Sequence, residues 1–201
     1  YVGPYLEFHP DLAWVIDNIF AHQNVPPFIA TRLIRSLVTS NPSPAYVARV
    51  SNVFINNGAG VRGDLAAVFA AILLDPEALT PDATLHGRLK DPVLHVMGLG
   101  RALNASLGDP GSFQYVFTNL SQRVLTPSTV FSFYSPTARI PSEQSLFGPE
   151  FQLYPPALAV QRANFIYGIL SGQFGSAFSI DMTPFRVLAA TPATLVEKVN
   201  T

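Results

Sequence analysis

Apolar residues recur every three to four positions along the first part of the chain, the spacing that places them on one face of an α-helix. Four segments show this pattern, separated by short polar or proline-containing stretches: residues 10–22, 26–38, 44–57 and 63–78. In the first of them Asp11 is suited to be the N-cap residue. The pattern therefore predicts four consecutive short amphipathic helices.

The pattern changes after Pro76. A polar connection leads to a fifth predicted helix that begins near Asp91 and Pro92, and residues 112–156 are rich in proline, serine and aromatic residues, which is typical of extended, turn-rich chain. A long helix is predicted over residues 155–172, and a last one begins at Thr191.

Together these elements predict an all-α fold of packed short amphipathic helices with an irregular arm rich in proline and aromatic residues. A chain of 201 residues is long enough for one domain with a proper core. We therefore expect a single helical domain over residues 1–201, with a helical core (1–110), the arm (111–156) and C-terminal helices (157–201).

Charge is scarce in this chain. Charged residues make up 12 % of it, and 12 basic residues stand against 13 acidic ones, so it lacks the basic surface that binds nucleic acid or anionic membranes. The mean hydropathy of +0.27 indicates either a bland surface or one that is partly covered by another protein surface, and we favour the second reading. The apolar run of residues 65–74 is too short to span a bilayer, so no transmembrane segment is expected.

The stretch between the third and fourth predicted helices contains Gly58, Gly60 and Gly63, the spacing of a dinucleotide-binding fingerprint. That site needs a preceding strand, whereas a helix precedes the glycines here. We therefore interpret the stretch as a helix-to-helix corner, with Asn57 and Gly58 ending one helix and Gly63 or Asp64 capping the next. An anion bound beside Arg62 is the alternative reading.

Candidate chemistry is sparse. Glu7, His9 and Asp11 could in principle ligate a metal, but their spacing fits no standard motif, so we predict no metal site and no cofactor. Glu143 and Glu150 could be paired carboxylates, although we expect both to be solvated loop acids. No catalytic residue is assigned, and the sequence leans against an enzyme.

The arm carries a concentration of aromatic side chains, which supply large apolar area and are enriched at interfaces. The candidate partner contacts are Phe131, Phe133, Tyr134, Phe151 and Tyr154. The alternatives are that these side chains pin the arm onto the helices, or that they form a platform on which sugar rings stack.

Three blocks of the sequence carry a resemblance to a known family: residues 20–78, 87–103 and 130–166. In these blocks, which occur in the family's order, the chain resembles the later, C-terminal part of the bacterial family called domain of unknown function 1800. The resemblance covers nearly the whole chain. The resemblance implies a largely helical, usually exported bacterial protein (periplasm, cell envelope or extracellular) whose full members are longer. It therefore implies that this chain is a fragment of a longer one.

These observations predict a non-catalytic structural or protein-interaction module of an exported protein, whose partners are other protein subunits or the remainder of its own chain. Two alternatives stay open at the level of sequence. One is part of an exported hydrolytic enzyme whose site is completed by an N-terminal half, and the other is an envelope polysaccharide binder.

Overall fold

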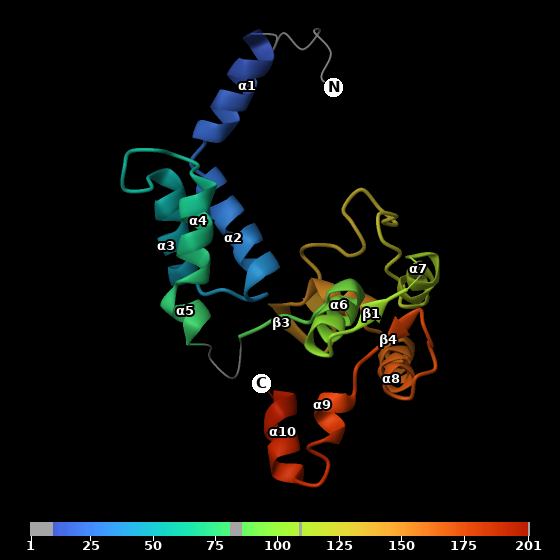
Figure 1. Cartoon of the computed structure of the whole chain (residues 1–201). Helices are drawn as coiled ribbons and strands as arrows, with labels where there is room; N and C mark the ends of the chain where they lie inside the picture. Colours follow the sequence, from blue (N-terminus) through green and yellow to red (C-terminus); the bar gives the residue numbers. More distant parts are fainter. Residues whose placement is uncertain (1–9, 81–85, 109, 201) are drawn as a thin grey trace. The chain divides into compact units, whose positions relative to one another are not determined.

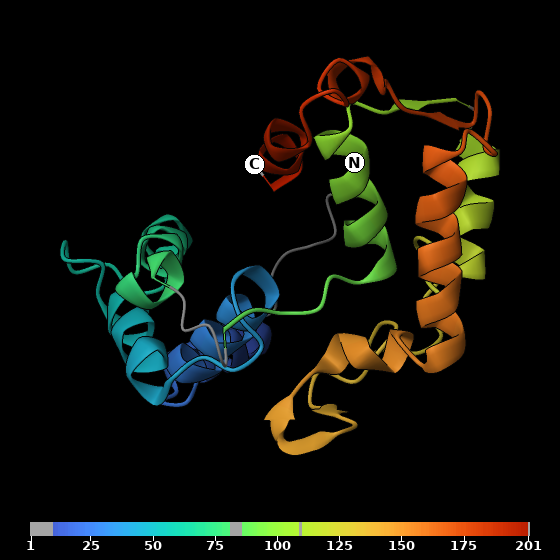
Figure 2. The same ribbon diagram turned by 90° about the horizontal axis from the view of Figure 1, so that it is seen from below.

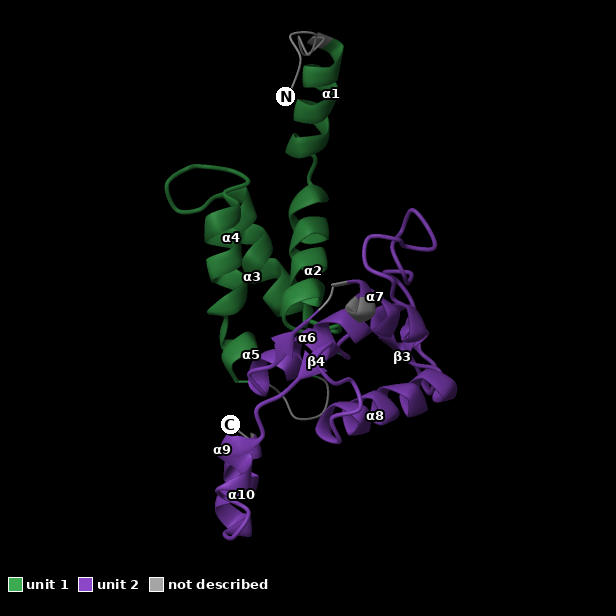
Figure 3. Cartoon of the chain, turned by 45° about the vertical axis from the view of Figure 1, so that its right-hand side comes forward, with its two compact units in different colours: residues 1–88 green, residues 89–201 purple. Residues whose placement is uncertain are grey.

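The computed structural model describes residues 10–80, 86–108 and 110–200, and these fall into two compact units, unit 1 (1–88) and unit 2 (89–201) (Figure 3). The regular elements among the described residues of unit 1 are all helices, labelled in Figure 1. They are α1 (Pro10–Ala21), α2 (Val25–Leu37), α3 (Pro44–Ile55), α4 (Leu65–Leu73) and α5 (Pro76–Leu79).

Short polar side chains begin three of the unit 1 helices. Ser43 accepts a hydrogen bond from the backbone of Tyr46, Asp64 accepts one from Ala67, and Asp75 accepts one from Glu77. Each bond satisfies a backbone N–H that the first helical turn leaves without an intrahelical partner. Helices are present in all four segments predicted from apolar spacing, with two differences. Asp11 lies in the first turn of α1 and not at its N-cap, and the segment 63–78 is divided into α4 and α5.

The core of unit 1 forms where α2, α3 and α4 pack together. Its buried residues recur at helical spacing on each of the three helices: Ala30, Ile34, Tyr46, Val50, Phe54, Val68 and Ile72. Within it the hydroxyl of Tyr46 donates a 2.6 Å hydrogen bond to the Ile72 carbonyl. Burial, followed by the charges of Asp75 and Glu77, raises the pKa of Tyr46 to about 12, so the hydroxyl remains a donor at neutral pH.

Polar contacts join α3 to α5 at the edge of this core. The guanidinium of Arg49 donates two 2.7 Å hydrogen bonds to the buried carboxylate of Asp75. This partner lowers the pKa of Asp75 and keeps the carboxylate ionised while it also caps α5. Glu77 in turn accepts hydrogen bonds from the backbone and hydroxyl of Ser43, which caps α3.

Unit 2 combines helices with two small antiparallel sheets. Its helical elements are α6 (Pro92–Ala102), α7 (Pro110–Asn119), the 3₁₀-helix η1 (Pro149–Leu153), α8 (Pro156–Leu170), α9 (Thr183–Arg186) and α10 (Pro192–Asn200). Strand β1 (Ser106–Leu107) pairs with β4 (Phe178–Ser179), and β2 (Arg139–Ile140) pairs with β3 (Glu143–Phe147).

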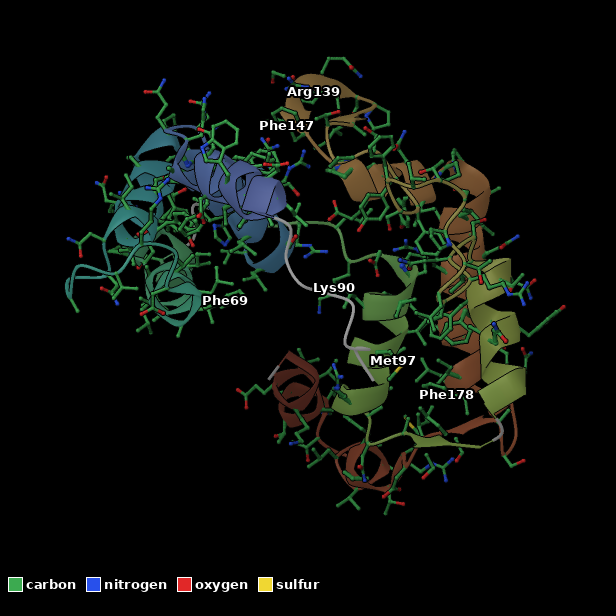
Figure 4. All side chains as sticks on the ribbon, turned by 90° about the horizontal axis from the view of Figure 1, so that it is seen from above. Phe69, Lys90, Met97, Arg139, Phe147 and Phe178 are labelled. Atoms are coloured by element: carbon green, nitrogen blue, oxygen red, sulfur yellow. The ribbon has the colours of Figure 1, made fainter. Side chains whose placement is uncertain are left out.

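The core of unit 2 lies between α6, α7, α8 and β4. Its buried members are Val96, Val116, Phe117, Leu120, Phe165, Ile169 and Phe178. Helices α7 and α8 lie side by side in Figures 1 and 2, and Figure 4 shows Phe178 of β4 near Met97 of α6. No helix in the described ranges has the length and apolar character needed to cross a membrane.

The predicted fold class is correct in outline, since the described structure is mostly helical, but small sheets are present and the all-α prediction is not exact. Helix α7 also occupies residues that we expected to be extended chain. Val116 and Phe117 of this helix and Leu120 just after it pack in the core, and that burial stabilises a helix whose local sequence gave a weak signal.

Candidate functional site

The glycine-containing loop between α3 and α4 is a corner between two helices, as predicted. Helix α3 ends with its C-cap at Asn56, one residue before the predicted Asn57 and Gly58, and Asp64 is the N-cap of α4, one of the two residues predicted for it. The side-chain oxygen of Asn56 accepts 2.9 Å hydrogen bonds from Gly58 and Gly60, and that of Asn57 accepts bonds from Ala59 and Val61. Backbone N–H groups that a phosphate would need are thus already bonded to asparagine side chains.

Arg62, the residue considered as an anion ligand, joins the loop to α1. Its guanidinium donates to the carbonyls of Phe20 and His22 and lies 5.5 Å from the Phe20 ring and 5.4 Å from the Phe54 ring. These bonds satisfy carbonyls at the C-terminal end of α1, where a positive charge is favourable. The side chain therefore has a structural role at this corner.

Replacing Gly63 with alanine is expected to destabilise unit 1 by about 2 kcal/mol, because left-handed backbone disfavours alanine and the new Cβ crowds a neighbour. The backbone φ is +77°, and a Cβ would lie 2.5 Å from the Phe20 ring. Thermal unfolding followed by circular dichroism measures the loss.

Gly58 and Gly60 provide matched controls, since both have positive φ but a Cβ at either would meet nothing within 4 Å. Their alanine variants are expected to lose only about 1 kcal/mol. Equal losses at all three positions would show that the contact between Gly63 and Phe20 is unimportant.

Of the three residues weighed as metal ligands, Glu7 and His9 lie outside the described residues, and Asp11 lies in the first turn of α1. Within the ranges that the structure does describe, no group of three or more histidine and acidic side chains is arranged to hold a metal ion.

A second group of polar contacts lies in unit 2, in a cluster that we call the polar junction: Asp91, Gln122, Tyr134 and Arg162. Asp91 caps α6 by accepting a 2.9 Å hydrogen bond from Leu94, and the Tyr134 hydroxyl lies 3.4 Å from its other oxygen. The buried amide oxygen of Gln122 accepts a 2.8 Å bond from the backbone of Val93. Two segments of the arm are thereby attached to the start of α6.

Arg162 is the central cation of the polar junction. It lies on α8, is only 5 % exposed, and donates hydrogen bonds to the carbonyls of Lys90 (2.9 Å) and Leu153 (3.4 Å). Its guanidinium also lies 4.8 Å from the centre of the Tyr154 ring. Burial lowers the pKa of this group, while Tyr154 and Asp91 oppose that effect. One side chain thus joins α8 to the segment before α6 and to the end of η1.

His95 is a titratable group on α6 that is influenced by the charge of Arg162. Its Nε2 atom is buried and has no hydrogen-bond partner among the described residues. Burial lowers the pKa of His95, and the positive charges of Arg162 and Lys90 lower it further, so the imidazole is neutral at neutral pH.

Glu150 corrects one prediction. We expected both Glu143 and Glu150 to be solvated loop acids, and this is right for Glu143, which is exposed and accepts hydrogen bonds from Ser145. Glu150, however, is 4 % exposed. The reason is that η1, a regular turn absent from our expectation for the arm, places Pro149, Glu150 and Leu153 on its buried side.

The five candidate partner contacts fall into different environments. Phe131 is 72 % exposed and Tyr154 is exposed at 36 %, whereas Phe133, Tyr134 and Phe151 are half-buried. Phe151 and Tyr154 make an edge-to-face contact with centroids 6.5 Å apart. In the β2–β3 hairpin, Arg139 lies over the Phe147 ring at 3.7 Å, and Figure 4 shows the two side chains together. The half-buried residues and Phe147 make contacts within unit 2, and Phe131 remains accessible to a partner.

Sequence reasoning missed two members of the polar junction, Gln122 and Arg162. Each lies in a local sequence that gives no signal, because a lone arginine within a helix, like Arg162, or a lone amide just after one, like Gln122, is ordinarily solvated. Asp91 was detectable through its position before Pro92, which is typical of a helix start.

Comparison with known proteins places these features in one family. The family model described as "Protein of unknown function (DUF1800)" matches residues 7–194, which is nearly the whole chain. Neither the curated proteins nor the solved structures contain a match to this chain.

Proposed function

The chain belongs to the DUF1800 family, and we propose that it is a non-catalytic structural or protein-interaction module of an exported bacterial protein, held in a larger assembly. Export enters the proposal through the family resemblance. The interaction role is supported by the surface of helix α1.

Helix α1 exposes a broad apolar face. Its six large apolar residues are between 41 and 68 % exposed: Leu12, Trp14, Val15, Ile16, Ile19 and Phe20. The helix has 12 residues, and an isolated helix of that length is only marginally stable in water, so tertiary or intermolecular packing must stabilise it. Burying such side chains contributes roughly 1.5 to 3 kcal/mol each, which favours a protein partner that covers α1.

A second exposed apolar group lies in the arm, where Val130 and Leu125 are almost fully exposed near Phe131 in the sequence. Large apolar side chains left this exposed are candidates for contact with a partner. Low overall charge is consistent with the same role, because charged residues are depleted at the centre of interfaces.

The native mass of the chain tests this proposal. When the chain is isolated from its source, we expect to find it in a larger assembly. When it is expressed alone, we expect it to self-associate, so that light scattering gives a mass above the 21.8 kDa of the monomer. The double variant Ile16→Glu with Ile19→Glu introduces two charges on α1. Expressed alone, this variant is expected to be a monomer, because burying a charged side chain in an interface costs free energy.

Asn18→Glu is the matched control, since it adds charge to an exposed polar position of the same helix. Trp14, the only tryptophan in the chain, reports on the interface through its emission. Its fluorescence should shift to the blue when α1 is covered and should be that of hydrated indole in the double variant. A wild-type chain that stays monomeric at all concentrations and in its native source would refute the proposal.

A further inference from the structure

A cavity of about 330 Å³ lies in unit 2 between α7, α8 and the turn that follows α8. Tyr115 and Asn119, four residues apart, face it from α7, while Gln161 and Asn164, three apart, face it from α8. Gln173 and Phe174 close it from the turn. The helical spacing thus brings the polar groups of two neighbouring helices to one opening.

Gly168 allows the turn to close this cavity. A Cβ at that position would lie 2.7 Å from the Phe174 ring and 3.1 Å from the side-chain oxygen of Gln173. Only a glycine on α8 therefore lets these two side chains approach the helix so closely. The floor is apolar, with the Phe165 and Phe174 rings 5.1 Å apart at a tilted angle.

The part of the lining that the structure describes is rich in carboxamides. Four of the described lining residues are amides, Asn119, Gln161, Asn164 and Gln173, and none of the described lining residues is Asp, Glu, His, Lys or Arg. Within the described part of the chain, no side-chain hydrogen bond is made by these amides. Gln122 provides the contrast, because its amide is buried and bonded to the backbone of Val93.

We propose that this cavity binds one ring of a neutral saccharide. Each carboxamide offers both donors and an acceptor, which matches hydroxyl groups that also donate and accept. The aromatic faces of Tyr115 and Phe174 suit the apolar face of a sugar ring. The volume is at the lower end of small-molecule sites, so it holds a single ring with the rest of the saccharide outside.

An anionic or cationic ligand fits this lining poorly, since no opposite charge compensates its desolvation. The amides and aromatic rings together therefore select for uncharged hydroxyl-rich ligands. This site lies wholly within unit 2, involves none of the five arm residues considered as partner contacts, and is independent of the proposed role of α1.

Saturation-transfer NMR and isothermal titration calorimetry of the full chain would test the site, with cellohexaose, maltohexaose and chitohexaose as neutral probes and hexagalacturonate as the anionic one. At least one neutral probe is expected to bind. Gln161→Ala with Asn164→Ala is expected to weaken that binding about tenfold or more, as the loss of one or two hydrogen bonds would.

Gln114→Ala is the matched control, because Gln114 is an exposed amide of α7 that does not line the cavity. It should bind like the wild type, and circular dichroism should show that all variants keep their helix content. The proposal is overturned if no neutral probe binds, if the double variant binds as well as the wild type, or if hexagalacturonate binds as tightly as the neutral probes.

Discussion

Replacing Ile72 with alanine is expected to lower the free energy of unfolding of unit 1 by about 4 kcal/mol, because it removes apolar contacts and leaves a cavity. Ile72 is fully buried on α4, where it packs in the core that joins α2, α3 and α4. The hydrogen bond from Tyr46 goes to its backbone carbonyl, so that bond is present in the variant as well. Hydrogen exchange of peptides from α2, α3 and α4 would measure the change.

Leu73 is the matched control for Ile72. It is the next residue of the same helix, loses a side chain of the same size, and is about half exposed. Leu73→Ala is expected to cost less than about 1 kcal/mol, since little of its contact surface is removed from water in the folded state. Similar losses for the two variants would mean that α4 does not pack as described.

Replacing Arg162 with alanine is expected to destabilise unit 2 by about 3 kcal/mol. The variant leaves the carbonyls of Lys90 and Leu153 without this donor and removes a long buried side chain that lies over Tyr154. Protection against hydrogen exchange should fall in α6, η1 and α8 together, because this one side chain connects all three.

Arg101→Ala controls for the loss of an arginine from unit 2, since Arg101 is exposed on α6. It should leave exchange protection nearly unchanged. Arg162→Lys should also destabilise unit 2, because the compact ammonium group of lysine lacks the planar guanidinium that donates to two carbonyls at once. An Arg162→Ala variant with wild-type protection in η1 would contradict the role of the polar junction.

The helices of unit 1 were predictable because their signals are local. Apolar residues three to four positions apart predicted α2, α3 and α4, and the residue type of Asp64 indicated the N-cap of α4. In unit 2 the same kind of local signal, Asp91 before Pro92, indicated the start of α6. The corner formed by Gly58, Gly60 and Gly63 could likewise be recognised, because the helix that precedes it excludes a dinucleotide site.

The candidate sites were less accessible to sequence reasoning. Phe131 and Tyr134 lie in the same aromatic-rich segment of the arm, yet Phe131 is exposed whereas Tyr134 is half-buried and its hydroxyl lies 3.4 Å from Asp91. The sequence did not predict the cavity between α7 and α8, because one of its four amides, Asn119, lies on a helix that we did not predict and the others become neighbours of it only in the folded chain.

The sequence by itself determined the family, the order of the main helices, several of their caps and the low charge, all properties of neighbouring residues or of the chain as a whole. Only the tertiary structure decided that Glu150 is buried, that Ser106 pairs with Ser179, and that α1 exposes an apolar face like the one α2 buries. The physical reason is that burial depends on which surfaces meet. That is set by contacts between residues far apart in the chain, whereas helix propensity and capping act within a few residues.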